Sequence, residues 1–162
     1  MESRYNAREI LEIAINIERN GAAYYRKASE FFENEELKKL LLELAEWEEK
    51  HIEIFKQMAK SIETYIDNLG EFKPEEYIKI TPRSMASLAV FSMGPYPEQI
   101  IKGIKDRREV LEKALKFEKD SIIFYQGLKN FAGNTEGFEK IDQIIAEEQK
   151  HIGIIQQSLK GL

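Results

Sequence analysis

Two glutamate–histidine pairs are the side chains in this sequence that are best suited to metal chemistry. Glu48 precedes His51 by three residues, Glu148 precedes His151 by three residues, and the chain has no other histidine. Residues three apart lie on one face of a helix, so each pair can bind one metal ion. An alternative is that both histidines are ordinary core residues paired to a nearby glutamate, which accounts for Glu48 and Glu148 but for no other buried acid.

Two further glutamates interrupt the apolar stripes of other helical segments, and these are Glu18 and Glu118. Glutamate is rarely buried without a partner, and an ionised, unpaired carboxylate in a core is costly. Two divalent cations would balance the charge of four such carboxylates. Four glutamates and two histidines from four helices form the ligand set of a di-iron or di-manganese carboxylate site in a bundle. The predicted metal ligands are Glu18, Glu48, His51, Glu118, Glu148 and His151.

An internal repeat relates the two halves of the chain. A shift of 100 residues superposes the halves without a gap and pairs all six predicted ligands with one another. One register holds through two helical segments and the loop between them, so accidental similarity of two Glu- and Lys-rich helices is a poor explanation. The pattern indicates a repeated helix pair. Other residues that recur at the same shift include Arg8 and Arg108, Leu11 and Leu111, Tyr25 and Tyr125, Asn34 and Asn134, and Gln57 and Gln157.

Helical periodicity runs through most of the chain, and no strand pattern survives beside it. We expect helices over residues 6–33, 35–67, 106–131 and 136–160, with a break at 133–135. Three sequence signals mark the helix starts, and they are Asn6 with Glu9, Asn34, and Asp106 with Glu109.

The segment 68–105 differs from the rest because it contains all four prolines of the chain. Its length of about 38 residues is enough to run back along a long helix, which makes the second and third helices parallel. We therefore predict one all-α domain over 1–162, an up-down-down-up four-helix bundle with a long crossover. A short helix is expected at 98–105. The apolar stretch Met85–Met93 is expected to pack on the core, with a dimer contact or a swapped element as the alternatives.

Composition excludes several classes of function. The chain has 162 residues, no cysteine and a formal net charge of −5. Thiolate metal sites, disulfides and a cysteine nucleophile are thereby excluded, and the acidic balance argues against nucleic-acid binding. No apolar run is long enough for a membrane span, and the first residues lack the apolar core of a signal peptide, so we expect a cytoplasmic protein.

With these residues and spacings the chain resembles the rubrerythrin-like branch of the ferritin-like di-iron carboxylate superfamily. The resemblance covers the four helices and implies two iron ions, with manganese or zinc as alternatives. It also implies a duplicated helix pair and a role for each ligand. By this resemblance Glu18 and Glu118 are expected to be terminal ligands and Glu48 and Glu148 to be bridging ligands. Each metal is expected to take one histidine, His51 or His151. Tyr25 and Tyr125 are similar to tyrosines that flank the site in rubrerythrins, although core filling explains them equally well.

Two features depart from the family pattern. Rubrerythrins have an additional glutamate three residues after the third-helix ligand, where this chain has Ser121. Full-length rubrerythrins also append a rubredoxin domain with four cysteines, which this chain lacks. Electrons must therefore come from a separate donor, either a small reductant or a rubredoxin-like protein.

The resulting hypothesis is a non-haem di-iron oxidoreductase that reduces peroxide or O₂ and forms a homo-oligomer, most simply a dimer. A ferroxidase-type iron-handling protein is one alternative; no recognisable fifth helix follows Lys160, which counts against a ferritin shell. A metal-free helical interaction module is the second alternative, and it requires the Glu and His stripes to face a partner or solvent. A hydroxylase acting on an organic substrate also remains open. Trp47, next to Glu48, is expected to pack in the core or in an interface.

Overall fold

The protein is a bundle of four long helices, seen in a computed structural model that describes residues 7–62, 101–129 and 135–162. The described residues contain no strand, in agreement with the predicted all-α fold. The helices are α1 (Ala7–Phe31), α2 (Glu35–Ile62), α6 (Arg107–Lys129) and α7 (Thr135–Lys160). No described helix combines the length and the apolar character that crossing a bilayer requires.

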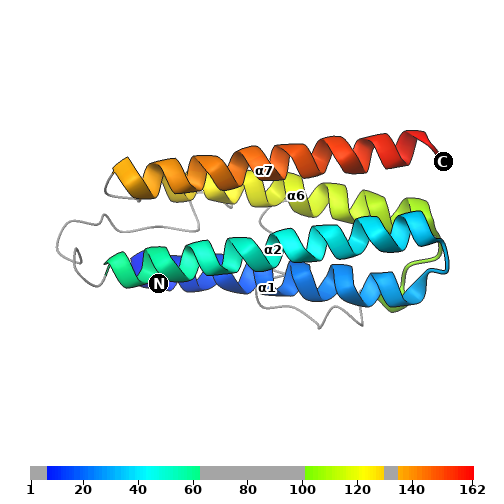
Figure 1. Ribbon diagram of the computed structural model, residues 1–162, viewed down its shortest axis with the longest axis horizontal. Coiled ribbons are helices and arrows are strands. Elements are labelled where there is room, and N and C mark those ends of the chain that lie inside the picture. Colours follow the sequence, from blue (N-terminus) through cyan, green and yellow to red (C-terminus); the bar gives the residue numbers. More distant parts are fainter. Residues whose placement is uncertain (1–6, 63–100, 130–134) are drawn as a thin grey trace, which may run out of the picture.

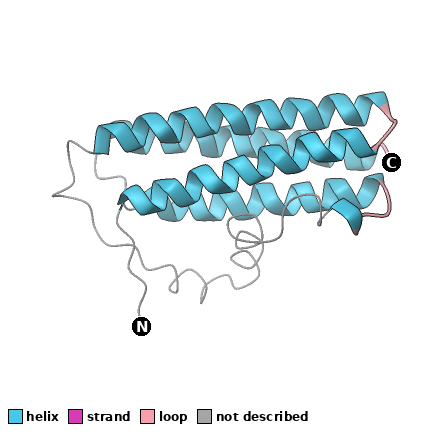
Figure 2. Ribbon diagram, turned by 90° about the horizontal axis from the view of Figure 1, so that it is seen from below, coloured by secondary structure: helices cyan, strands magenta, loops and turns pink. Residues whose placement is uncertain are grey.

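The helices follow the predicted up-down-down-up order (Figure 1). α1 and α2 run antiparallel to each other, as do α6 and α7, and α2 is parallel to α6. Each half of the internal repeat therefore forms one helix hairpin, and the two hairpins lie side by side (Figure 2). Ligands from all four helices can meet in the interior of such a bundle.

Two of the predicted helix caps are present as hydrogen bonds. The side chain of Asn34 accepts a hydrogen bond from the backbone N–H of Leu37, with Oδ1 and N 2.9 Å apart. Asp106 Oδ1 accepts one from the N–H of Glu109, also at 2.9 Å, and Glu109 Oε2 accepts one from the N–H of Lys105 at 2.9 Å. The bonds from the N–H groups of Leu37 and Glu109 satisfy backbone donors that a helix leaves unpaired in its first turn.

Some expected boundaries differ from the structure or fall outside its described part. α1 ends at Phe31, two residues before the expected end at 33, because Asn34 begins the next helix and the residues between form the turn. α7 begins one residue earlier than expected. Several expectations lie outside the described residues: the cap at Asn6, the end of the second helix at 67, the crossover with Met85–Met93, the first part of the 98–105 helix, the end of the third helix at 131, and the break at 133–134. Residues 101 and 102 are helical, in agreement with the expected helix at 98–105, but residues 103–105 are not, so this helix ends earlier than expected.

The core is formed by the inward stripes of the four helices, and the close approach of α1 to α6 depends on a glycine. A Cβ atom built on Gly21 of α1 would lie 2.7 Å from Cζ of Phe117 on α6. Phe117 is 1% exposed, so its ring has little room to move away. Gly21 therefore lets the Phe117 ring reach the backbone of α1, and the two hairpins meet at this point.

Candidate metal centre

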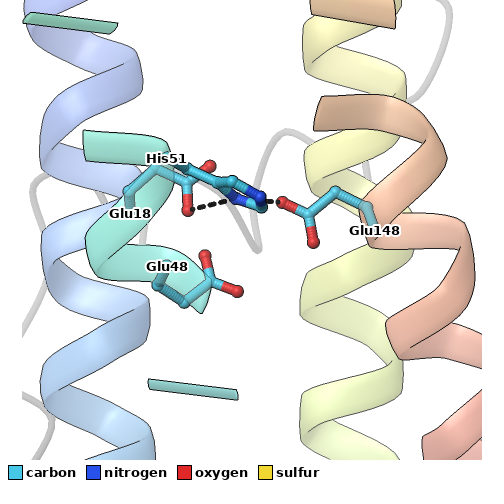
Figure 3. Close-up of side chains that lie close together, drawn as sticks. All are labelled: Glu18, Glu48, His51 and Glu148. Atoms are coloured by element: carbon cyan, nitrogen blue, oxygen red, sulfur yellow. Dashed lines mark ion pairs between the residues drawn. The ribbon is translucent and has the colours of Figure 1, made fainter. Parts of the chain in front are cut away.

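The six predicted ligands meet in the interior of the bundle. Every one of them is fully or almost fully buried, with at most 2% of its surface exposed. α1 contributes Glu18, α2 contributes Glu48 and His51, and Figure 3 shows these three side chains facing Glu148 of α7. A metal-free interaction module would require the Glu and His stripes to face a partner or solvent. That expectation is wrong, because these side chains lie in the interior of the bundle. The full set is Glu18, Glu48, His51, Glu118, Glu148 and His151.

The ligands form two overlapping groups of four, each gathered closely enough to hold a metal ion. In each group the potential ligand atoms lie within 4.8 Å of one another. Glu48 and Glu148 belong to both groups. We call the group with Glu18 and His51 the His51 half-site, and the group with Glu118 and His151 the His151 half-site. Two carboxylates common to two ligand groups can bridge two metal ions.

Both histidines direct the same ring nitrogen, Nδ1, towards the carboxylates. In the His51 half-site Nδ1 lies 3.1 Å from Glu148 Oε1 and 3.4 Å from Glu18 Oε2. In the His151 half-site Nδ1 lies 3.0 Å from Glu148 Oε2 and 3.5 Å from Glu118 Oε2. The ring centroids are 6.0 Å apart and nearly parallel. Nδ1 of both histidines thus lies closest to Glu148, and the Nδ1 contacts depart from the twofold relation of the internal repeat, since Nδ1 of His151 is 3.9 Å from Glu48 Oε1.

Several buried polar atoms of this cluster have no hydrogen-bond partner within the described residues. Both carboxylate oxygens of Glu48 are in this position, as is Nδ1 of His51. One oxygen each of Glu18, Glu118 and Glu148 completes the group. Buried polar atoms are normally paired, and unpaired ones call for an explanation such as an ion. Carboxylate oxygens and imidazole nitrogens are ligands for iron, manganese or zinc, so the residues present fit two such ions.

Burial and crowding perturb the protonation of three of the carboxylates, Glu48, Glu118 and Glu148. Burial raises the pKa of Glu48 well above its usual range, and the charges of Glu18, Glu148 and Glu118 raise it further. Burial and the charge of Glu148 also raise the pKa of Glu118. Burial acts in the same direction on Glu148, but its close contacts with Glu118, His151 and His51 outweigh burial and lower the pKa of Glu148. The metal-free cluster therefore holds protons that metal binding would release.

The same carboxylates raise the pKa of both histidines, although burial alone would lower it. Burial lowers the pKa of His51, but the charge of Glu18, the hydrogen bond to Glu147 and the close Glu148 carboxylate raise it well above its ordinary value. For His151, burial is outweighed by the close Glu118 carboxylate and the hydrogen bond to Glu148, and its pKa rises to about 9. Without metal, protonated imidazoles thus balance part of the carboxylate charge.

Comparison with known proteins agrees with this geometry. The sequence model of the family described as Rubrerythrin matches residues 9–159. This chain belongs to the rubrerythrin family. Its fold resembles the crystal structure of a ferritin-like diiron-carboxylate protein from Thermotoga maritima, with 29% sequence identity and a TM-score of 0.76. That similarity covers 99% of this chain and 98% of the other chain. No curated protein sequence gave a match.

In this member of the rubrerythrin family, the two predicted tyrosines join the repeats at the site. Tyr25 of α1 donates a hydrogen bond to Glu118 of α6, and Tyr125 of α6 donates one to Glu18 of α1. Burial and the neighbouring carboxylates raise the pKa of both phenols well above the ordinary value, so both remain protonated donors. Each tyrosine therefore contacts a predicted terminal ligand and is more than core filling.

Two further contacts at the rubrerythrin-type site were missed by the sequence reasoning. Glu147 Oε2 lies 2.8 Å from Nε2 of His51, the ring nitrogen that points away from the carboxylates. The Trp47 ring lies against His151, with centroids 5.8 Å apart. Residues 47 and 147 are equivalent in the repeat and differ in type, which is the signal that could have drawn attention to them.

The position that departs from the family pattern is occupied by a small buried side chain. Ser121 is 1% exposed, and its hydroxyl donates a hydrogen bond to the carbonyl oxygen of Phe117, one turn earlier in α6. Its repeat equivalent is Gly21, where an added Cβ atom would lie 3.6 Å from Glu48 Oε2. Neither position supplies a further carboxylate.

Proposed function

We propose that this protein is a non-haem di-iron oxidoreductase that reduces peroxide or O₂ with electrons from a separate donor. The observation that carries the proposal is the sharing of Glu48 and Glu148 between two buried ligand groups. Under this assignment Glu48 and Glu148 would bridge the metals, Glu18 and Glu118 would each hold one metal, and each histidine would ligate one ion through Nδ1. Membership of the rubrerythrin family and the diiron-carboxylate description of the Thermotoga relative support iron over manganese or zinc.

Two adjacent ferrous ions supply two electrons and a Lewis-acidic surface to a small oxidant. For hydrogen peroxide the balance is two electrons and two protons for each O–O bond broken, which gives two waters and two ferric ions. The protein's own part is to hold the ligands in a buried, preorganised cluster and to exclude bulk water. Tyr25 and Tyr125 hold the terminal glutamates in place through their hydroxyl hydrogen bonds.

The electrons that return the ferric ions to the ferrous state must come from outside the chain in this proposal. The sequence has no cysteine and thus no cluster or dithiol of its own. A small one-electron reductant or a rubredoxin-like protein has the required chemistry. A dimer is the simplest assembly for such an enzyme, and its mass in solution tests that expectation.

The deciding experiment is anaerobic reconstitution with ferrous iron, followed by a single addition of hydrogen peroxide. We expect two irons per chain, one peroxide consumed per two irons oxidised, and a near-ultraviolet absorption of oxo-bridged ferric iron. Glu48→Ala and Glu148→Ala should lose two-iron occupancy. Glu49→Ala is the matched control, because Glu49 is a neighbouring exposed acid paired with Arg26.

The outcomes separate the alternatives. Iron uptake far beyond two per chain, without turnover by an added reductant, would instead favour the iron-handling protein. Retention of both irons by the Glu48 and Glu148 variants would refute the ligand assignment. No iron uptake, with an unchanged melting temperature, would refute the metal centre itself.

A further inference from the structure

The two half-sites differ in what contacts the outer nitrogen of their histidine. Nε2 of His51 lies 2.8 Å from the carboxylate of Glu147, which comes from the opposite hairpin. His51 is completely buried, whereas the Glu147 side chain is 29% exposed. The contact thus ties a buried imidazole on α2 to a carboxylate at the edge of α7.

The His151 half-site has no equivalent carboxylate. The residue at the position equivalent to Glu147 is Trp47, whose ring lies 5.8 Å from the His151 ring at an angle of 57° between planes. An indole has a single N–H donor and no acceptor, so it cannot accept a hydrogen bond from an imidazole N–H. Within residues 7–62, 101–129 and 135–162, no side chain is hydrogen-bonded to Nε2 of His151.

Several other features of the two half-sites match. Both half-sites use Glu48 and Glu148, and both histidines point Nδ1 inwards. The terminal glutamate of each half-site accepts a hydrogen bond from a tyrosine of the other repeat. The inner contacts differ in one respect: Nδ1 of both histidines lies close to Glu148, at 3.1 and 3.0 Å, whereas Glu48 lies 3.9 Å from Nδ1 of His151. The partner of the outer nitrogen is the difference that involves a residue outside the ligand set.

A carboxylate that accepts the outer N–H of a metal-bound histidine fixes its tautomer and ring orientation and makes it a better ligand. We propose that Glu147 is a positioning residue that makes the two half-sites unequal, so that the His51 half-site binds metal first and more tightly than the His151 half-site. This inference rests on the di-metal centre proposed above. It adds an order of loading that the twofold repeat of the sequence does not suggest.

Calorimetric titration of the metal-free protein with Co²⁺ tests the order, because Co²⁺ binds the same ligand types without redox chemistry. We expect two binding steps, the first with a dissociation constant about 10- to 100-fold lower than the second, the range typical for such outer partners. Glu147→Ala should weaken the first step by a similar factor. Glu147→Gln keeps an acceptor without the charge and should restore part of the loss. Glu49→Ala removes an acid near the site that contacts Arg26 instead, and it should leave both steps unchanged.

Variants that keep one complete half-site make the assignment independent of the two-step fit. His151→Ala keeps the His51 half-site, and His51→Ala keeps the His151 half-site. We expect the first variant to bind one Co²⁺ more tightly than the second. Adding Glu147→Ala should weaken binding only in the His151→Ala chain. Far-ultraviolet circular dichroism checks that each variant is folded, and the single Glu147→Ala variant tests the proposal if either histidine variant is not.

A spectroscopic signature distinguishes positioning from a general effect on stability. In the Co²⁺-loaded protein, the Nε2–H proton of His51 should give a hyperfine-shifted proton resonance that exchanges slowly with solvent and broadens in Glu147→Ala. Two indistinguishable binding steps, or equal effects of Glu147→Ala on both half-sites, would overturn the inference and leave the di-metal centre intact. Absence of any Co²⁺ binding would overturn both.

Discussion

Tyr25 of α1 donates a hydrogen bond to Glu118 of α6, with the phenol oxygen 2.5 Å from Oε1. The two residues are 93 positions apart in the sequence and belong to different hairpins. Tyr125 makes the reciprocal bond to Glu18. These crossed pairs join the repeats at the metal centre, so each hairpin helps to hold a predicted terminal ligand of the other.

Removing the Tyr125 hydroxyl should destabilise the metal-free protein more than removing a hydroxyl bonded to a neutral acceptor. A hydrogen bond to a charged group contributes about 1.5–3 kcal/mol, against about 0.5–1.5 kcal/mol for a neutral pair. Tyr125→Phe, which loses the bond to Glu18, should fall in the higher range. Tyr25→Phe should fall in the lower range, because the raised pKa of Glu118 favours a protonated, neutral acceptor. Tyr24→Phe is the matched control, because the Tyr24 hydroxyl donates to the carbonyl oxygen of Val110. Urea unfolding measures all three, and equal losses would contradict the prediction.

The stability of the metal-free protein should fall as the pH rises from about 6.5 to about 9. The pKa of His151 in the folded protein is about 9, against an ordinary value of 6.5, so its protonation favours the folded state below 6.5. That stabilisation is lost as the pH passes through the folded value. The raised pKa values of Glu48 and Glu118 act in the same direction.

Thermal unfolding at a series of pH values checks this dependence. The metal-loaded protein should vary much less over the same interval, because its ligands are already deprotonated. A metal-free melting temperature that rises between pH 6.5 and 9 would contradict the assignment of proton-holding groups in the cluster.

The helical fold and the six metal ligands can be predicted from the sequence because both depend on local spacing. Glu-x-x-His places two ligands on one helical face, and the repeat puts the same pattern in both hairpins. The four helices and their order agree with the structure, and all six predicted ligands come together within it. An acidic residue within the apolar stripe of a helix can be recognised as a candidate ligand without knowing how the helices pack against one another.

Contacts between helices do not follow from local spacing. Tyr25 and Tyr125 can be identified by their sequence positions. Which residues accept their hydrogen bonds depends on how α1 and α6 are offset along their axes. Glu147 resembles any solvated acid of a helix surface, and only the crossing of α7 over α2 brings it to His51. The relative position of two helices is set by side-chain packing, which a periodic pattern does not encode.

Glu48→Gln should stabilise the metal-free protein while preventing two-metal binding. Both oxygens of Glu48 are buried without a hydrogen-bond partner among the described residues, and burial together with the other carboxylates of the cluster raises its pKa. An amide of the same shape removes the like-charge repulsion. We expect a gain of about 1 kcal/mol at alkaline pH, equivalent to roughly 2–4 °C in melting temperature for a chain of this size.

Loss of the bridging charge has the opposite consequence for the loaded protein. Elemental analysis of Glu48→Gln should find fewer than two metals per chain, and added metal should raise its melting temperature less than it raises that of the unaltered protein. Glu49→Gln, on the exposed side of α2, is the control and should behave like the unaltered protein. A destabilised metal-free Glu48→Gln protein would show that the buried carboxylate is compensated in another way.

The close contact between Gly21 and Phe117 predicts a size-dependent penalty that a second substitution relieves. An added Cβ at position 21 would lie 2.7 Å from the buried Phe117 ring, and overpacking of this kind costs about 1–3 kcal/mol. Gly21→Ser should therefore destabilise the protein. Phe117→Ile should remove much of the penalty in the double variant, because Ser121 and Ile17 occupy the equivalent positions of the other hairpin.

Gly153→Ala is the control: no heavy atom lies within 4 Å of its added Cβ, and better helix propensity should stabilise it by up to about 1 kcal/mol. Chemical denaturation of the four variants gives the coupling energy directly, and additive effects at positions 21 and 117 would contradict the contact.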